Sequence, residues 1–258
     1  MTRNVRPIVA ALLGAGMLAA TWPGATAVAA PTPRGSVTVS AAASLTEAFT
    51  RLGEAFERKN PDATVTFNFG SSSALVGQIQ GGAPADVFAS ADLATMDKLV
   101  SGGQVVTTPT PFARNQMQIA VKPGNPKHVK SVSDLTDIGT IALCGAAVPC
   151  GIYATSVLER ADVTVPESSI TRSVDAKATL GAVSQGDANA AIVYITDVKA
   201  AGTTVTAVTI PDDQNVNAVY PIAPIATASN PKLAKSFVAY VLSPAGQRTL
   251  AKYGFLAP

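Results

Sequence analysis

Five residues that can offer hydrogen-bond donors stand where the sequence predicts a strand to end or a helix to begin. They are Ser44, Ser72, Cys150, Ala176 and Tyr194. The first backbone N–H groups of a helix have no partner within the helix and carry a partial positive charge, so they can bind an anion. The pattern therefore indicates an anion site. Every α/β protein has such junctions, however. The same residues also fit a purely structural interpretation, in which Ser44 caps a helix and Ser71–Ser73 form a turn.

Few residues have the types and spacing of a catalytic site. The single histidine, His128, lies in a polar stretch flanked by proline, and we expect it to be exposed. The segment Gly70–Ala74 lacks the Gly-x-Ser-x-Gly spacing of a nucleophile elbow. Ser229 and Lys232 match Ser-x-x-Lys, but the Asn-Pro between them is typical of a turn. We expect no enzyme, and a secreted serine hydrolase is the alternative from another class.

Residues 1–29 have the pattern of a secretory signal peptide. Arg3 and Arg6 supply the positive charge, residues 8–20 form an apolar run, and Ala27-Val28-Ala29 provides small residues for cleavage. The run is shorter than the roughly 20 residues that span a bilayer. No cysteine lies near the cleavage region, so no lipid anchor is expected. We expect the mature chain to be exported to the periplasm or the extracytoplasmic cell envelope.

Export changes the interpretation of the two cysteines. Cys144 and Cys150 enclose the short segment Gly-Ala-Ala-Val-Pro, and an oxidising compartment favours their pairing. The spacing is not the Cys-x-x-Cys of redox or zinc sites, and two ligands do not satisfy zinc. We therefore predict a structural disulfide, which stabilises the fold by about 2 kcal/mol for so short a loop, and no metal site.

Composition places the chain among globular proteins and gives no sign of nucleic-acid binding. Of its 258 residues, 47% are hydrophobic and 14% are charged, which allows a large core and argues against disorder. The net charge of +2 comes from 19 basic and 17 acidic residues. Arg3 and Arg6 are the only charged residues of the leader, so the mature chain has 17 of each and is formally neutral.

Strand and helix patterns alternate along the mature chain. A helix is expected from the capping-box segment Ser44–Glu47 to Asn60-Pro61, and Ser243 is the expected N-cap of the last helix. The expected strands are 37–39, 64–69, 86–90, 117–121, 140–144, 190–195, 203–210 and 216–226, and the other expected helices are 74–80, 93–102, 152–160, 176–185, 231–242 and 244–252. This alternation predicts an α/β architecture with largely parallel sheets.

Six short blocks closely resemble the molybdate-binding proteins of ABC transporters, the ModA family. The blocks are Ser40–Leu45, Gly70–Leu75, Gly82–Asp92, Val148–Ala154, Ile192–Tyr194 and Tyr253–Phe255. They follow one another in the family's order from about Ser36 to Phe255. The resemblance implies a periplasmic-binding-protein-like fold of two α/β lobes with a hinge and a ligand cleft between them. Lobe one would comprise residues 36–112 and 220–258, and lobe two residues 113–219.

The resemblance also implies a role for each of the five donor residues. Ser44 and Ser72 would donate hydroxyl and backbone N–H bonds from lobe one, Cys150 and Ala176 backbone N–H bonds from lobe two, and Tyr194 its phenolic O–H. Cys150 and Ala176 stand where the family often has alanine and valine, which backbone roles tolerate. The match around Ala176 is the loosest, so that its neighbours Asp175 and Lys177 are alternatives.

The implied ligand is molybdate, or tungstate, which has the same charge and nearly the same size. Such a dianion can only accept hydrogen bonds, and each bond to it contributes roughly 1.5–3 kcal/mol. The ideal site for such a dianion contains hydrogen-bond donors and no nearby carboxylate. The alternative ligand is another tetrahedral oxyanion such as sulfate. The family implies delivery to the permease and ATPase of an ABC importer at the membrane. We expect a monomer without a cofactor.

Overall fold

The computed structural model describes residues 1–2 and 33–258. The predicted signal peptide, residues 1–29, therefore lies outside the described residues except for its first two. Within the described part, no helix is both long enough and apolar enough to cross a membrane. The described residues 33–258 belong to one compact unit.

The described strands form one mixed sheet in the order β2-β1-β3-β9-β4-β7-β5-β6, with β8 paired to β4. The strands are β1 (Gly35–Ala42), β2 (Ala63–Gly70), β3 (Val87–Ala89), β4 (Thr110–Val121), β5 (Ile141–Cys144), β6 (Ile170–Ser173), β7 (Ala190–Tyr194), β8 (Thr206–Val208) and β9 (Asn217–Pro224). The outer groups β2-β1-β3 and β7-β5-β6 are parallel. The expectation of largely parallel sheets is wrong for the middle of the sheet, where β4 and β9 run antiparallel to their neighbours.

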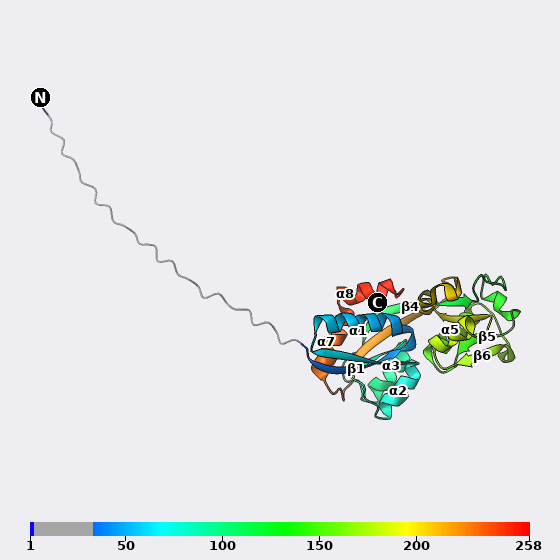
Figure 1. Cartoon of the computed structure of the whole chain (residues 1–258), viewed down its shortest axis with the longest axis horizontal. Helices are drawn as coiled ribbons and strands as arrows, with labels where there is room; N and C mark the ends of the chain where they lie inside the picture. Colours follow the sequence, from blue (N-terminus) through cyan, green and yellow to red (C-terminus); the bar gives the residue numbers. More distant parts are fainter. Residues whose placement is uncertain (3–32) are drawn as a thin grey trace. The chain divides into compact units, whose positions relative to one another are not determined.

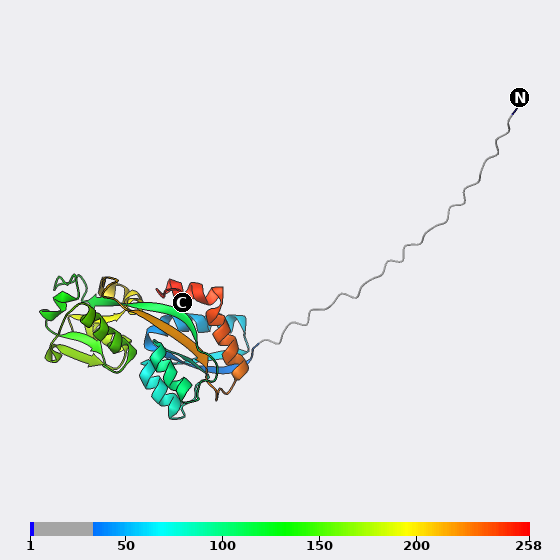
Figure 2. The ribbon, with the colours of Figure 1, turned by 180° about the vertical axis from the view of Figure 1, so that it is seen from behind.

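Strand β4 belongs to both parts of this sheet. It pairs with β9 from Thr110 to Gln116 and with β7 from Met117 to Val121. Figures 1 and 2 show it running from the part that holds β1 to the part that holds β5 and β6. Because one long strand is shared, the helix N-termini of the two parts are held close to each other.

Eight helices cover the sheet within the described residues. They are α1 (Thr46–Lys59), α2 (Ser72–Gln80), α3 (Leu93–Ser101), α4 (Pro149–Arg160), α5 (Ala176–Ser184), α6 (Ile195–Ala201), α7 (Pro231–Leu242) and α8 (Pro244–Lys252). Alternate residues of a strand face opposite sides. In β3, Val87 and Ala89 join the apolar cluster that contains Phe49 of α1, whereas Phe88 joins the cluster that contains Met96 of α3. Both faces of the sheet are therefore buried.

Most expected elements are present, with differences at their ends. The helices 231–242 and 244–252 are confirmed, and Ser243 accepts a hydrogen bond from Gly246 N (3.2 Å) as the predicted cap. Helix α4 begins three residues earlier than expected, at Pro149. Strand β6 and helix α6 were not expected from the sequence. Strand β6 is short and half exposed, and α6 follows β7 without an intervening loop.

The predicted capping box at the start of α1 is wrong. Ser44 lies in a 3₁₀ turn, Ala43–Leu45, and the N-cap of α1 is Leu45, which makes no side-chain cap. The Ser44 hydroxyl instead lies 2.9 Å from the Tyr220 hydroxyl, and Glu47 accepts hydrogen bonds from Lys177. Both capping groups are thus taken by partners distant in the sequence.

Candidate functional site

All five predicted site residues line one pocket. The pocket contains about 240 Å³ of space not filled by atoms, part of it open to solvent. Its described wall is made by six chain segments, which are Ala42–Ser44, Gly70–Ser72, Ala91, Val148–Cys150, Asp175-Ala176 and Tyr194. These segments lie at the ends of strands or the starts of helices on both sides of β4 and β9. The convergence predicted from the sequence is therefore present in the fold.

Of the serines that line the pocket, Ser44 and Ser72 are buried, with exposed fractions of 4% and 1%. Ser72 is the first residue of α2, and its Oγ accepts a hydrogen bond from Ala91 N (3.0 Å). The cap of α2 is the preceding Ser71, whose Oγ accepts from Ala74 N (3.3 Å). Because Ser72 Oγ is an acceptor in the fold, its own proton is available to a ligand.

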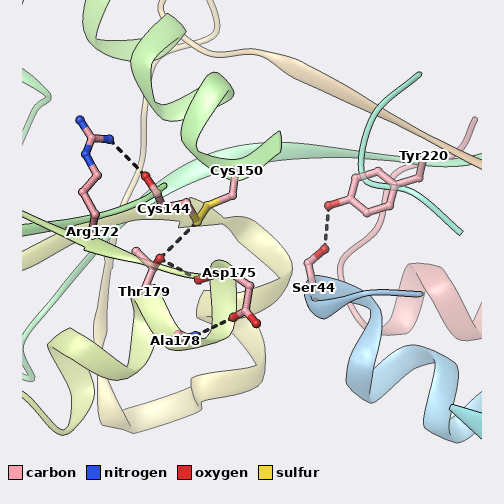
Figure 3. Close-up of a disulfide and its surroundings, with 8 residues drawn as sticks. All are labelled: Ser44, Cys144, Cys150, Arg172, Asp175, Ala178, Thr179 and Tyr220. Atoms are coloured by element: carbon pink, nitrogen blue, oxygen red, sulfur yellow. Dashed lines mark hydrogen bonds between the residues drawn. A yellow bond between two sulfur atoms is a disulfide. The ribbon is translucent and has the colours of Figure 1, made fainter. Parts of the chain in front are cut away.

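Cys150 lies in the first turn of α4 and forms the predicted disulfide with Cys144, the last residue of β5. Pro149 occupies the first turn, where its missing N–H costs nothing. A Cβ on Gly151, the residue after Cys150, would clash with the carbonyl oxygen of Gly145. Only glycine therefore lets the start of α4 approach the end of β5 this closely. This close approach and the disulfide to Cys144 (Figure 3) together fix the first turn of α4, which contains Cys150.

Ala176 begins α5, and its preceding residue, Asp175, is the N-cap. The Asp175 carboxylate accepts from Ala178 N (2.9 Å), and its carbonyl accepts from the Thr179 hydroxyl (2.8 Å). Figure 3 shows these bonds beside the disulfide, where Thr179 Oγ1 lies 3.2 Å from Cys144 Sγ. Of the two alternatives to Ala176, Asp175 also lines the pocket, whereas Lys177 is not among the lining residues.

Tyr194 ends β7 at the position just before α6. It is 1% exposed, and its ring packs against the rings of Tyr153 and Tyr220 at centroid distances of 6.4 and 5.9 Å. Burial raises the pKa of Tyr194 well above its usual value, so the phenol keeps its proton. Within the described chain, its hydroxyl makes no hydrogen bond to a protein group. A buried donor without a partner, at the wall of a pocket, points to a ligand as the partner.

The described lining of the pocket offers helix N-termini and neutral donor groups rather than cationic side chains. In the described structure, no lysine, arginine or histidine lines it. Asp175 is the one lining residue with a carboxylate, and this differs from the expected site without a carboxylate. One oxygen of that carboxylate is occupied by the N–H of Ala178, which places the charge at the positive end of α5.

A cluster of three charged residues lies beside the pocket. Lys177 Nζ donates to both carboxylate oxygens of Glu47 in α1, at 2.7 and 2.8 Å, and lies 3.5 Å from Asp197 Oδ1 in α6. Asp197 is fully buried, and its two oxygens make no hydrogen bond to a described protein group. Burial raises the pKa of Asp197 to about 6, and Lys177 only partly opposes this shift.

Asp197→Asn is expected to stabilise the protein at neutral pH and not at acidic pH. Because the pKa is raised from 3.8 to about 6 on folding, the folded state binds this proton more tightly, and the unfolding free energy falls as pH rises through that interval. The unfolding free energy of the variant minus that of the wild type should grow by roughly 3 kcal/mol between about pH 4 and pH 7. Urea unfolding at several pH values measures it. Asp187→Asn, at an exposed position, is the control, and a pH-independent difference for Asp197→Asn would contradict the expectation.

Two residues beside the site carry no recognisable sequence signal. Tyr220 of β9 and Asn115 of β4 are fully buried, and both belong to a hydrogen-bond chain that ends at Ser44. Each stands in an otherwise ordinary strand pattern and lies more than 70 residues from Ser44 in the sequence. The pairing of β4 with β9 brings the two residues together next to Ser44.

The residues of the alternative hydrolase reading are not assembled into a site. His128 is exposed, as predicted, on a turn with positive φ. The Ser229 hydroxyl donates to Asp86 Oδ1 (2.9 Å), and that carboxylate also accepts from the backbone N–H of Ser229. Lys232 is exposed at the start of α7. Among the described residues, no cluster of three potential metal ligands is present.

Comparison with known proteins gives concordant results. The family model described as bacterial extracellular solute-binding protein matches residues 37–256. The molybdate-binding protein ModA of Mycobacterium tuberculosis is 41% identical over 254 residues, which are 97% of each chain.

Two solved structures are similar in fold. The periplasmic molybdate-binding protein of Azotobacter vinelandii has a TM-score of 0.79 at 19% identity, over 86% of this chain and 99% of that one. The sulfate-binding protein SubI of Mycobacterium tuberculosis has a TM-score of 0.77 at 20% identity, over 85% and 86% of the two chains. At these identities the likeness concerns the fold alone.

Proposed function

Because this chain belongs to the bacterial extracellular solute-binding proteins and, within them, to the ModA family, we propose that its pocket captures molybdate for an ABC importer. The ligand contacts would come from the hydroxyls of Ser44, Ser72 and Tyr194 and from the backbone N–H groups of Cys150 and Ala176. The single observation that carries this assignment is the convergence of these donors on one pocket, whose lining includes no cationic side chain among residues 33–258.

The chemistry of this donor set suits a fully deprotonated oxyanion. Molybdate is a dianion that can only accept hydrogen bonds, and buried hydrogen bonds to a charged group contribute roughly 1.5–3 kcal/mol each. Neutral donors also avoid leaving a charged side chain buried when no ligand is bound. Tungstate offers the same oxygens and charge and should bind in the same way. Sulfate is the second candidate, supported by the shared fold of SubI.

We place the two lobes at residues 36–112 with 220–258, and at residues 113–219. The support is the change of partner along β4, which leaves β9 for β7 between Gln116 and Met117. Closure of such lobes would bring Cys150 and Ala176 toward Ser44 and Ser72. The ion pair between Glu47 and Lys177 joins the two proposed lobes beside the pocket. The exported chain would act as a monomer without catalysis and would deliver its anion to the membrane permease and its ATPase.

Asp175→Asn is expected to tighten molybdate binding by about threefold or more. An asparagine oxygen can still accept the Ala178 N–H and cap α5, whereas the negative charge near the dianion is removed. Titration calorimetry at low and at high salt measures the effect, which should shrink as salt screens it. Asp187→Asn, at an exposed position, serves as the control. Weaker binding by a folded Asp175→Asn protein would assign the carboxylate a favourable role that this account does not give it.

A thermal-unfolding screen of the mature protein with molybdate, tungstate, sulfate and phosphate tests the function. At a ligand concentration 100 times the dissociation constant, stabilisation is about 2.7 kcal/mol, which raises the midpoint by roughly 5–10 °C for a chain of this size. We expect this rise with molybdate and tungstate at lower concentrations than with sulfate. Stabilisation by sulfate alone would favour the second candidate, and turnover of esterase substrates would favour a hydrolase.

A further inference from the structure

Ser44 stands at the end of a buried chain of hydrogen bonds that begins at Asn115 in β4. Its Oγ lies 2.9 Å from Tyr220 Oη, and Asn115 Nδ2 lies 3.4 Å from the same phenolic oxygen. Asn115 and Tyr220 are fully buried, and Ser44 is 4% exposed. Figure 3 shows the hydroxyl groups of Tyr220 and Ser44 pointing toward each other.

The direction of hydrogen bonding is fixed at the Asn115 end. The backbone N–H of Gln116 donates to Asn115 Oδ1 (3.0 Å). A backbone N–H can only donate, so the amide atom that faces it must be the oxygen, which settles the orientation of the amide. The amide nitrogen therefore faces the other way, where it donates to Thr196 Oγ1 (2.9 Å) and to Tyr220 Oη.

This direction is passed on to Ser44. Tyr220 accepts from Asn115, so its own proton is directed to its other partner, Ser44 Oγ. Burial raises the pKa of Tyr220, and the phenol therefore keeps that proton. Ser44 Oγ then accepts from Tyr220, and the serine proton remains for the pocket. Ser72 reaches the same state by a shorter route, because its Oγ accepts directly from the backbone N–H of Ala91 (3.0 Å).

We propose that Asn115 and Tyr220 are positioning residues that make Ser44 present a proton to the pocket and thereby select unprotonated over protonated tetrahedral dianions. A dianion such as selenate has four accepting oxygens, which suit both serines. Hydrogenarsenate has a similar size and the same charge, but one oxygen carries a proton that needs an acceptor. Opposite Ser44 or Ser72, that proton would face another proton. The inference rests on the proposed function, since it concerns the same pocket.

The test is the ratio of the dissociation constants for hydrogenarsenate and selenate, measured by calorimetry at mildly alkaline pH, where both are dianions. In the wild type we expect selenate to bind at least about tenfold more tightly. Tyr220→Phe keeps the ring and removes the proton directed at Ser44, so the ratio should fall by at least about threefold, mainly through weaker selenate binding. Tyr240→Phe, a matched change in α7 far from the pocket, should leave the ratio unchanged.

Asn115→Asp provides a second variant that reverses the chain rather than interrupting it. The carboxylate would accept from Tyr220, Tyr220 would then accept from Ser44, and Ser44 would present a lone pair to the pocket. The ratio should fall further than in Tyr220→Phe. The added charge acts equally on two anions of equal charge. The Asp175 carboxylate lines the pocket in every protein, so its effect cancels when the ratio of a variant is compared with that of the wild type.

The outcomes separate this inference from the function. If the wild type binds neither molybdate nor selenate, the proposed function fails. If the wild type binds molybdate but binds hydrogenarsenate as tightly as selenate, the inference alone is overturned, and this measurement does not depend on any variant folding. The inference is also overturned if Tyr220→Phe and Asn115→Asp fold, as judged by cooperative thermal unfolding, and both keep the wild-type ratio.

Discussion

Replacing both Ser44 and Ser72 by alanine is expected to weaken molybdate binding by at least about a hundredfold, with each single change costing about tenfold or more. The Ser44 hydroxyl accepts a hydrogen bond from Tyr220, and the Ser72 hydroxyl accepts one from Ala91 N. The proton of each serine hydroxyl is therefore free to be donated to a ligand. The double variant removes both donors from the β1 and α2 side of the pocket. Calorimetric titration with molybdate measures the loss.

The control for the serine variants separates binding from stability. Ser243→Ala removes the cap of α8, which accepts from Gly246 N and lies outside the residues that line the pocket. Loss of such a cap costs about 1 kcal/mol of stability, whereas molybdate affinity should not change. If the double variant Ser44→Ala/Ser72→Ala remains folded and binds molybdate as the wild type does, these hydroxyls are not ligands.

Tyr194→Phe is expected to weaken molybdate binding by roughly 10- to 100-fold without lowering the stability of the ligand-free protein. The Tyr194 hydroxyl is buried at the pocket and makes no hydrogen bond to a described protein group. Its removal therefore breaks no hydrogen bond to a described protein group, and phenylalanine retains the ring packing against Tyr153 and Tyr220. A buried polar group without a partner costs free energy, so the midpoint of thermal unfolding should be no lower than that of the wild type.

The comparison of free and bound stability makes this prediction specific. Wild type and Tyr194→Phe should unfold at similar temperatures without ligand and at different temperatures with molybdate. Tyr253→Phe, a matched change at a partly exposed tyrosine after α8, should behave as the wild type in both conditions. A Tyr194→Phe protein that loses stability without ligand but keeps its affinity would make the hydroxyl a structural group.

Much of the site could be predicted because it is built from local signals. Ser72, Cys150 and Ala176 lie in the first turns of α2, α4 and α5, and strand-to-helix junctions are visible in the hydrophobic pattern. The disulfide followed from a short spacing together with expected export. The family resemblance then specified which junctions belong together, and all five lie in one pocket.

The features that sequence reasoning missed depend on contacts between distant segments. The capping box at Ser44 failed because Tyr220 and Lys177, which are remote in the sequence, take the two capping groups. Asn115 and Tyr220 look like ordinary strand residues until β4 pairs with β9. The sequence placed Asp175 near the pocket only as the neighbour of Ala176. Asp175 is the N-cap of α5 and Ala176 is its first residue, so a shift of one residue in the family match exchanges a capping carboxylate for a backbone N–H donor.

The most direct test of the account is a calorimetric titration of the mature protein with molybdate, repeated in excess sulfate. We expect one molybdate per chain, bound with micromolar or tighter affinity, and about the same affinity in sulfate at a tenfold excess over molybdate. Saturable binding of neither molybdate nor tungstate, by a protein that is folded under the same conditions, would contradict it.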